Sequence, residues 1–249
     1  FFLFSFSTRH IISYPTMTMT KSMDNAPISD VAQVANKNVT SESDYWNSFY
    51  SKFNVSHPSQ FCVMTAVEAE RDRPIVEFGC GNARDSIYFA SHGYTVYGCD
   101  LSQPAIDKNS EKSKDIPSLE FKVVDASNAD QVQGIVDKAR AESNADNVNV
   151  YTRFFLHSID EIQQAKLFAA LSNVLVAGDK LYFEFRSKMD ESLDKVHGKE
   201  HYRRYVDTPM MMEDLSKLGF DVVYEMTGQG MAKYKEEDPF VSRIIARRV

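Results

Sequence analysis

The stretch PIVEFGCGNARDSIYFASHGYTVYGCD, residues 74–100, decides the fold class of this chain. A short apolar run ends in the turn Gly79-Cys80-Gly81, a helix-like segment follows, and a second apolar run closes on Asp100. A strand, a glycine turn, a helix and a second strand form half of a nucleotide-binding βαβ unit. The glycines let the backbone approach a ligand, and Asp100 is placed to accept hydrogen bonds from a ribose diol.

Two details of this motif distinguish between kinds of nucleotide ligand. A dinucleotide fingerprint has a third glycine at its sixth position, where this chain has Arg84. Glu77 stands two residues before the first glycine, where a carboxylate would repel a pyrophosphate but suits a cationic amino-acid end. The motif therefore favours a cofactor that carries a cation. A NAD(P)-dependent oxidoreductase is the alternative, and thermal stabilisation by NAD(P)H would distinguish it.

Residues 77–85 follow the pattern E-x-G-C-G-x-x-R-D, and with Asp100 they resemble motif I of the class I S-adenosylmethionine-dependent methyltransferases. The resemblance covers residues 41–249. It implies an α/β, Rossmann-like, doubly wound and mostly parallel seven-stranded sheet with an antiparallel C-terminal hairpin. It also implies S-adenosylmethionine as cofactor and S-adenosylhomocysteine as product. The cofactor contacts that it implies are Glu77, Gly79, Cys80, Gly81, Asn82, Arg84, Asp85, Asp100, Leu101, Asp125 and Ala126.

The acid after the third predicted strand has two interpretations. Residues 119–124 are predicted as this strand, and Asp125 follows them. The family resemblance implies that Asp125 accepts a hydrogen bond from the exocyclic amine of adenine. Alternatively, Asp125 is the N-cap of the next helix.

Composition bounds the location and the partners of the chain. Its 249 residues suit one α/β domain, and a net charge of −7 argues against nucleic acid as the main partner. No apolar run is long enough to span a bilayer. Three cysteines without C-x-x-C spacing argue against a disulfide framework or a zinc knuckle and favour a cytoplasmic, reducing location. No Asp, Asn or His set has metal-ligand spacing, so we expect no metal. Monomer and homodimer both remain open.

The chain divides into a leader and one methyltransferase domain. Residues 1–40 are rich in Ser and Thr and have no acid before Asp24, which fits either a segment for organelle import or a translated leader. Within 41–249 we expect N-terminal lid helices, a cofactor-binding core, a substrate-side insertion, and a C-terminal helix with a hairpin, over residues 41–73, 74–185, 186–208 and 209–249. The aromatic stripe of residues 45–53 is either a lid or plain packing.

The remaining elements follow from apolar periodicity and from helix start and stop signals. Helices are predicted at residues 58–70, 102–109, 161–176 and 208–218. Further strands are predicted at residues 148–155, 180–185, 220–227 and 240–247. The last two strands form a hairpin, so we expect a reversed strand at the edge of the sheet.

Arginine and histidine concentrate in the two segments that should line the acceptor side. These segments follow the fourth and fifth strands, whose carboxyl ends meet at the ligand-binding edge of such a sheet. Arginine commonly holds carboxylates or phosphates, so the sequence predicts a small anionic metabolite as acceptor. Alternatively, Arg203 and Arg204 lie on a solvated surface. The candidate substrate contacts are Tyr45, Trp46, Arg153, His157, Arg186, His201, Arg203 and Arg204.

The methyl transfer requires few catalytic groups from the protein, because the sulfonium methyl is already activated. The protein must align the reactants and exclude water. An oxygen or protonated nitrogen acceptor also needs a base. His157 is the candidate, with Arg153 as the second catalytic residue; alternatively, His157 is structural. The acceptor atom, O, N or S, stays open.

Residues 236–239 are a charge run that is either solvated or closed over the pocket. A third reading is a non-catalytic partner subunit with the methyltransferase fold.

Overall fold

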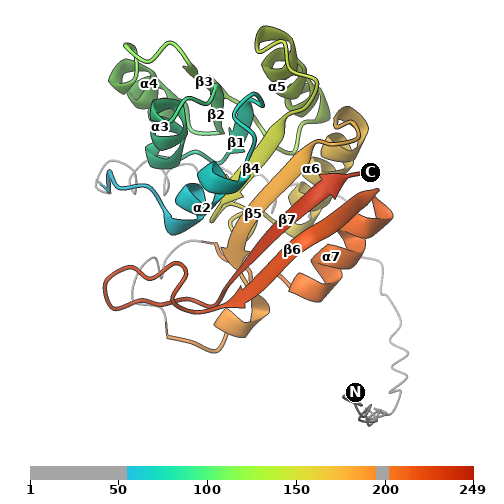
Figure 1. Cartoon of the computed structure of the whole chain (residues 1–249). Helices are drawn as coiled ribbons and strands as arrows, with labels where there is room; N and C mark the ends of the chain where they lie inside the picture. The colour runs from blue at the N-terminus through green and yellow to red at the C-terminus, as the bar shows by residue number, and fades with distance from the viewer. Residues whose placement is uncertain (1–54, 195–201) are drawn as a thin grey trace, which may run out of the picture. The chain divides into compact units, whose positions relative to one another are not determined.

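The computed structural model describes residues 55–194 and 202–249. They form a seven-stranded sheet in the order β3-β2-β1-β4-β5-β7-β6 (Figure 1). The strands β1 to β5 are parallel to their neighbours, and β7 runs antiparallel to both β5 and β6. Their bounds are β1 Ile75–Phe78, β2 Val96–Asp100, β3 Leu119–Val123, β4 Asn149–Arg153, β5 Lys180–Arg186, β6 Phe220–Gly228 and β7 Val241–Arg248. This is the predicted doubly wound sheet.

The reversed strand lies one place in from the edge, which corrects the prediction of a reversed edge strand. β7 inserts between β5 and β6, and its first six residues are all buried. The first six residues of β6 alternate between exposed side chains and buried or half-buried ones, as expected of a strand that is covered on one face only. The more buried strand of the hairpin therefore takes the interior position.

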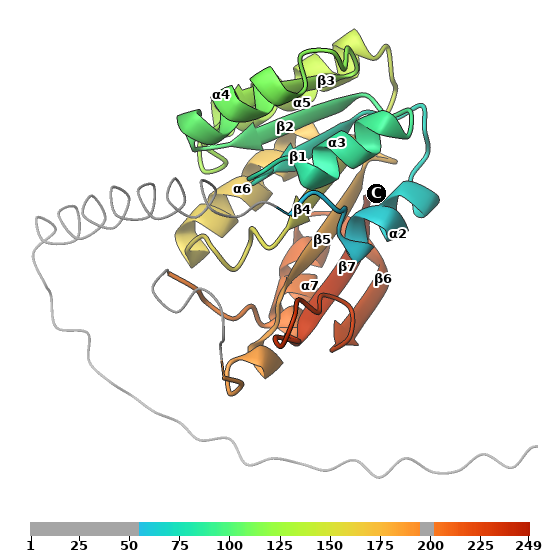
Figure 2. The ribbon, with the colours of Figure 1, turned by 90° about the vertical axis from the view of Figure 1, so that its left-hand side faces the viewer.

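Helices cover both faces of the sheet. Their bounds are α2 Gln60–Glu68, α3 Arg84–Ser91, α4 Gln103–Lys112, α5 Ala129–Glu142, α6 Glu161–Val174 and α7 Thr208–Lys217, with a short 3₁₀ turn at Lys188–Asp190. α2, α3 and α4 share one apolar cluster with the sheet, and α5, α6 and α7 share the other. Figure 2 shows α2 and α3 on the opposite side of the sheet from α6. Successive strand residues supply both clusters: Ile75 packs in the first and Val76 in the second.

Local capping explains where the helices begin. Ser102 accepts a hydrogen bond from the backbone of Ala105, and Asp160 with Gln163 forms a capping box on α6. The helix that follows the third strand had no predicted bounds, and the structure places it as α5. The N-cap of α5 is Asn128, so the alternative that made Asp125 the cap is wrong.

The fourth strand is shorter than the predicted 148–155. Phe154 has φ +54°, a left-handed conformation that takes the chain out of the extended region at the carboxyl end of β4. This bend directs the next residues across the end of the sheet. Within the described parts of the chain, no helix is both long enough and apolar enough to cross a membrane.

Candidate active site

A pocket of about 530 Å³ lies at the carboxyl ends of the parallel strands. Its volume falls within the range of about 300–1,000 Å³ that is usual for small-molecule sites. The walls come from the β1–α3 turn, the segments after β2, β3, β4 and β5, and the β6–β7 connection. Every cofactor residue expected from the resemblance, from Glu77 to Ala126, lines this pocket.

The β1–α3 turn is built on left-handed residues. Gly79 has φ +73° and Gly81 has φ +52°, which favours glycine at both positions. A Cβ on Gly79 would lie 2.5 Å from the ring of Phe155. Packing against Phe155 therefore requires glycine at position 79, a reason other than the expected approach of a ligand. Ala83 has φ +62° and is fully buried; a left-handed non-glycine residue costs about 1–2 kcal/mol.

Asp100 connects the ends of the first two strands. Its Oδ2 accepts the backbone N–H of Gly81 at 2.9 Å, and its Oδ1 accepts that of Ser102 at 3.0 Å. Burial raises the pKa of Asp100 although these N–H groups favour the ionised form. Each carboxylate oxygen has a second lone pair, so the arrangement fits a ligand diol. Asp125 accepts both the backbone N–H and the hydroxyl of Ser127 through one oxygen, at 2.8 Å each.

Glu77 and Asp85 lie close together but differ in their bonding. Glu77 is 3% exposed and accepts a hydrogen bond from the hydroxyl of Ser86. Burial, and then the negative charge of Asp85, raises the pKa of Glu77 to about 8. A cationic ligand would stabilise the ionised form of this carboxyl group, and the expected cofactor has such a cationic end.

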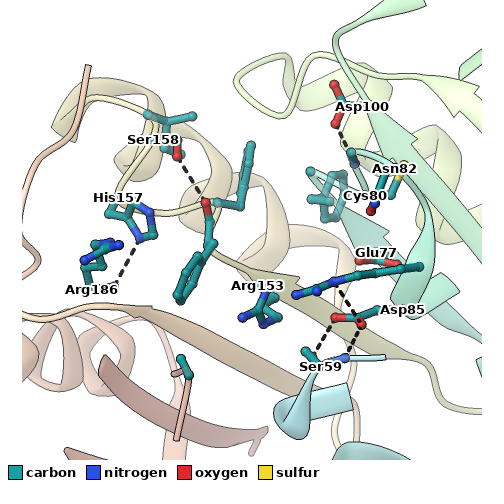
Figure 3. Close-up of a pocket in the computed structure, with 18 of the residues that line it drawn as sticks. Ser59, Glu77, Cys80, Asn82, Asp85, Asp100, Arg153, His157, Ser158 and Arg186 are labelled. Atoms are coloured by element: carbon teal, nitrogen blue, oxygen red, sulfur yellow. Dashed lines mark hydrogen bonds and ion pairs between the residues drawn. The ribbon is translucent and has the colours of Figure 1, made fainter. Parts of the chain in front are cut away.

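The Asp85 carboxylate is instead occupied by protein donors. It accepts the N–H of Ser59 at 2.8 Å and the hydroxyl of Ser59 at 2.7 Å (Figure 3). It also accepts the hydroxyl of Tyr151 at 2.9 Å. Asp85 thereby ties the start of α2 to β4. Its position in the pocket wall is predicted by the sequence, whereas its role as an anchor is not.

The side of the pocket where the sequence predicts the acceptor begins at Arg153, which lies between the expected cofactor residues and His157 (Figure 3). Its Nε is 2.8 Å from Oε1 of Glu184, and its guanidinium stands 4.3 Å over the ring of Phe154. The other oxygen of Glu184 accepts a 2.8 Å hydrogen bond from Arg243. Glu184 is fully buried, so one carboxylate holds two arginines between β4, β5 and β7.

Arg186 is tied to two carboxylates. Nη1 donates to Asp190 at 2.7 Å, and Nη2 donates to Glu237. Glu237 is buried and lines the pocket together with Pro239. The charge run 236–239 therefore contributes to the pocket wall, and the purely solvated alternative is wrong for Glu237.

His157 is buried, and its hydrogen bonding identifies its tautomer. The backbone N–H of Arg186 donates to Nδ1 of His157 at 3.1 Å (Figure 3). Because that partner is a donor, Nδ1 must accept, and the neutral imidazole carries its hydrogen on Nε2. This geometry favours a hydrogen-bond donor at Nε2 over a base.

The two neighbouring arginines of the insertion have different positions. Arg203 lines the pocket. Arg204 does not, which corrects its expected role as a substrate contact: its guanidinium donates to the carbonyls of Ile159 at 2.7 Å and Leu156 at 2.9 Å, and to Gln164. These acceptors at the start of α6 hold the side chain there. Tyr45, Trp46 and His201 lie outside the described residues.

Several residues that build the site were missed in the sequence: Ser59, Tyr151, Phe155, Glu184 and Arg243. Ser59 had a readable signal, because serine just before a helix is a common N-cap. Glu184 and Arg243 are charged residues within apolar strands, LYFEF and VSRII, which also indicated burial with a partner.

The fold defines the class of protein. A methyltransferase from Anabaena variabilis ATCC 29413, described as S-adenosylmethionine-dependent, is 17% identical over 83% of this chain and 93% of its own, with a TM-score of 0.64. One from Methanosarcina mazei is 17% identical over 75% and 97%, with a TM-score of 0.58. A third, 1,6-didemethyltoxoflavin-N1-methyltransferase from Burkholderia thailandensis, is 14% identical over 92% and 93%, with a TM-score of 0.58. These likenesses establish the class I methyltransferase fold.

A family model matches the sequence of the core. Residues 75–178 match the family model of a methyltransferase domain. The chain carries an S-adenosylmethionine-dependent methyltransferase domain, which makes it a methyltransferase, and the family implies S-adenosylmethionine as the methyl donor. A search of curated proteins found no match to the sequence.

Proposed function

We propose that this methyltransferase acts on a small anionic molecule. The bound cofactor would supply an activated methyl group on a sulfonium, so we propose transfer without a metal, by alignment and exclusion of water. In this proposal Glu77 holds the cationic amino-acid end, Asp100 the ribose hydroxyls and Asp125 the adenine amine. Three buried thiols support the further proposal of a reducing, cytoplasmic location.

The proposal of an anionic acceptor is supported by the separation of negative and positive side chains along the pocket. Carboxylates line it on the side of β1, β2 and β3, namely Glu77, Asp85, Asp100 and Asp125. Cations line it on the side of β4, β5 and the β6–β7 connection, namely Arg153, Arg186, Arg203, Lys233 and Lys235. Arg84 on the first side and Glu237 on the second are the exceptions. In a chain of net charge −7, this cationic side supports an anionic ligand.

Among the cations, Arg153 is the strongest candidate for direct contact. Arg186 is compensated by Asp190 and Glu237, whereas the ion pair of Arg153 with Glu184 uses its Nε. In the described parts of the chain, no carboxylate other than Glu184 forms an ion pair with Arg153. A guanidinium in this state is suited to hold a carboxylate through its Nη atoms.

The structural neighbours support the size of the acceptor. The Burkholderia thailandensis enzyme was solved with 1,6-didemethyltoxoflavin and S-adenosylhomocysteine bound. It is therefore a relative in fold whose acceptor is a small molecule. We infer the same scale of acceptor for this chain.

The test begins with methyl-labelled S-adenosylmethionine and a metabolite extract, followed by mass spectrometry of the labelled product. With the product's precursor as substrate, Arg153→Gln should raise KM about tenfold or more without changing cofactor affinity. Arg247→Ala, which alters an exposed arginine near the other end of β7, is the control. A neutral or cationic acceptor, or an unchanged KM in Arg153→Gln, would contradict the proposal.

A further inference from the structure

We infer that the acceptor atom is already anionic when the substrate binds, as a carboxylate oxygen or a thiolate sulfur, and that the protein supplies hydrogen-bond donors instead of a base. This inference rests on the proposed function and deepens it, because it names the chemistry of the atom that receives the methyl group. The evidence for it is the pattern of hydrogen bonds and ion pairs made by the polar groups on the acceptor side, which is the side of β4, β5 and the β6–β7 connection.

The first step concerns His157, the one imidazole among the described pocket-lining residues. To act as a base through Nε2, it would need its hydrogen on Nδ1, where the backbone N–H of Arg186 already points. Two donors would then face each other at 3.1 Å, in a buried site where an unpaired N–H is costly. Protonation to imidazolium would produce the same clash. The backbone N–H of Arg186 therefore keeps the hydrogen of His157 on Nε2, where it can be donated. Arg186 thus acts as a positioning residue for His157.

The second step concerns the carboxylates of the same side. Glu184 is held by Arg153 and Arg243, and Glu237 by Arg186. Asp190 accepts from Arg186 at 2.7 Å and from the backbone N–H of Phe240 at 2.9 Å. The oxygens of these carboxylates are thus already engaged by guanidinium or backbone donors, which leaves them poorly placed to take a proton from a substrate.

The third step concerns the neutral groups that line this side. The amide oxygen of Gln163 accepts the N–H of Asp160 in the capping box, and the hydroxyl of Ser158 donates to the carbonyl of Phe154. Lys233 and Lys235 carry ammonium groups, which are hydrogen-bond donors. Tyr234 also lines this side, but it is 36% exposed to water. Apart from this phenol, the described residues of the acceptor side offer donors and cations, with no buried group arranged to remove a proton.

An anionic acceptor makes a base unnecessary. A lone pair of the carboxylate oxygen or thiolate sulfur forms the new bond to the methyl carbon, while the bond between carbon and the sulfonium sulfur breaks and its electron pair stays on that sulfur. The negative and positive charges neutralise each other, and no proton moves. Charge neutralisation is favoured in a water-excluded pocket, whereas an alcohol or a protonated amine would have to lose a proton first.

The test identifies the labelled atom. The full chain is incubated with methyl-labelled S-adenosylmethionine and a metabolite extract, and each product is fragmented by mass spectrometry. We expect the label on a carboxylate, as an ester that alkali hydrolyses, or on sulfur, as a thioether that alkali leaves intact. A label on a hydroxyl oxygen or on nitrogen would overturn the inference while leaving the proposed methyl transfer in place. Measured cofactor binding with no labelled product would overturn both.

A second measurement separates donor from base. His157→Gln retains an N–H donor but has no imidazole, so we expect kcat to fall about threefold to tenfold, the effect of a displaced hydrogen bond. Loss of a general base would instead reduce kcat about 10²- to 10⁴-fold. At saturating S-adenosylmethionine, with a carboxylate product precursor, kcat/KM of the wild type for this acceptor should stay flat from about pH 6 to pH 9; with a thiol, it should follow the pKa of the free thiol. A loss above 100-fold in His157→Gln, or a step in kcat/KM that disappears in this variant, would overturn the inference.

Discussion

The protonation of one buried side chain, Glu77, should respond to cofactor binding. It stands within β1, beside Asp85 and away from water, and its pKa is raised to about 8. The unfolded chain binds fewer protons than the folded one between the ordinary value of 4.5 and this raised value. The contribution of Glu77 to stability is therefore greatest below pH 4.5 and is lost as the pH rises through 8.

A bound cation should reverse this balance, because it favours the ionised carboxylate. At pH 7 we expect S-adenosylmethionine binding to release up to about one proton per chain, and the affinity to increase as the pH rises towards 8. Calorimetry in buffers of different ionisation enthalpy measures this release. Glu77→Gln should bind more weakly and release none. Equal proton release in wild type and variant would show that another group titrates.

At the scale of elements, the β6–β7 connection forms a wall of the pocket through a few polar contacts. Glu237 is bound by Arg186, and the carbonyl of Met231 accepts from Arg243 at 2.8 Å. Lys233 and Lys235 between these anchors are exposed. The connection therefore combines anchored ends with accessible basic residues.

Loss of one anchor should expose this connection to trypsin. We expect Glu237→Gln to increase the rate of cleavage after Lys233 or Lys235 about tenfold, because a hydrogen bond between charged groups is removed. Mass spectrometry identifies the cut. Glu236→Gln changes the exposed neighbour and should cleave like the wild type; equal rates in both variants would mean that Glu237 does not hold the connection.

The start of α2 is a second element whose position depends on one side chain. Ser59 accepts the N–H of Cys62 at 2.9 Å and donates to Asp85 at 2.7 Å. Ser59→Ala removes both interactions and should lower the free energy of unfolding by about 1–2 kcal/mol, measured in urea. Ser172→Ala, which removes one exposed hydroxyl contact on α6, is the control. A change below that of the control would contradict the anchoring role of Ser59.

For the molecule as a whole, the order of the strands places the carboxylates and the cations at different parts of the pocket. A buried ion-pair cluster also connects β4, β5 and β7. Glu184 and Arg243 are register partners across β5 and β7, and Arg153 on β4 joins them. The single carboxylate of Glu184 is shared by both arginines, so the cluster depends on this residue. Breaking such a buried cluster leaves unpaired charges in the interior.

Glu184→Gln should therefore lower the free energy of unfolding by about 3–5 kcal/mol, since two arginines lose their shared carboxylate. Urea unfolding of the full chain gives the value. Glu120→Gln, which alters the partly exposed pair with Lys138, should change it by less than about 1 kcal/mol. Similar values for the two variants would indicate that the cluster contributes no more than a surface pair.

The sequence predicted what depends on neighbouring residues along the chain. The glycine turn, Asp100 at the end of β2 and the Ser102 cap are local signals, and the structure places them as expected. Pairings between distant segments were not readable. The register of Glu184 with Arg243, the insertion of β7 beside β5 and the turn of Arg204 towards α6 depend on contacts that periodicity does not encode.

The central claim is that the pocket binds S-adenosylmethionine through the ends of the first strands. Calorimetry with S-adenosylmethionine and S-adenosylhomocysteine tests it most directly. We expect one site per chain for each ligand, and an affinity at least about tenfold lower in Asp100→Ala, because charged hydrogen bonds are lost. Asp107→Ala, on the exposed face of α4, should bind like the wild type. No binding of either ligand by the folded wild type, or equal binding by Asp100→Ala, would contradict the claim.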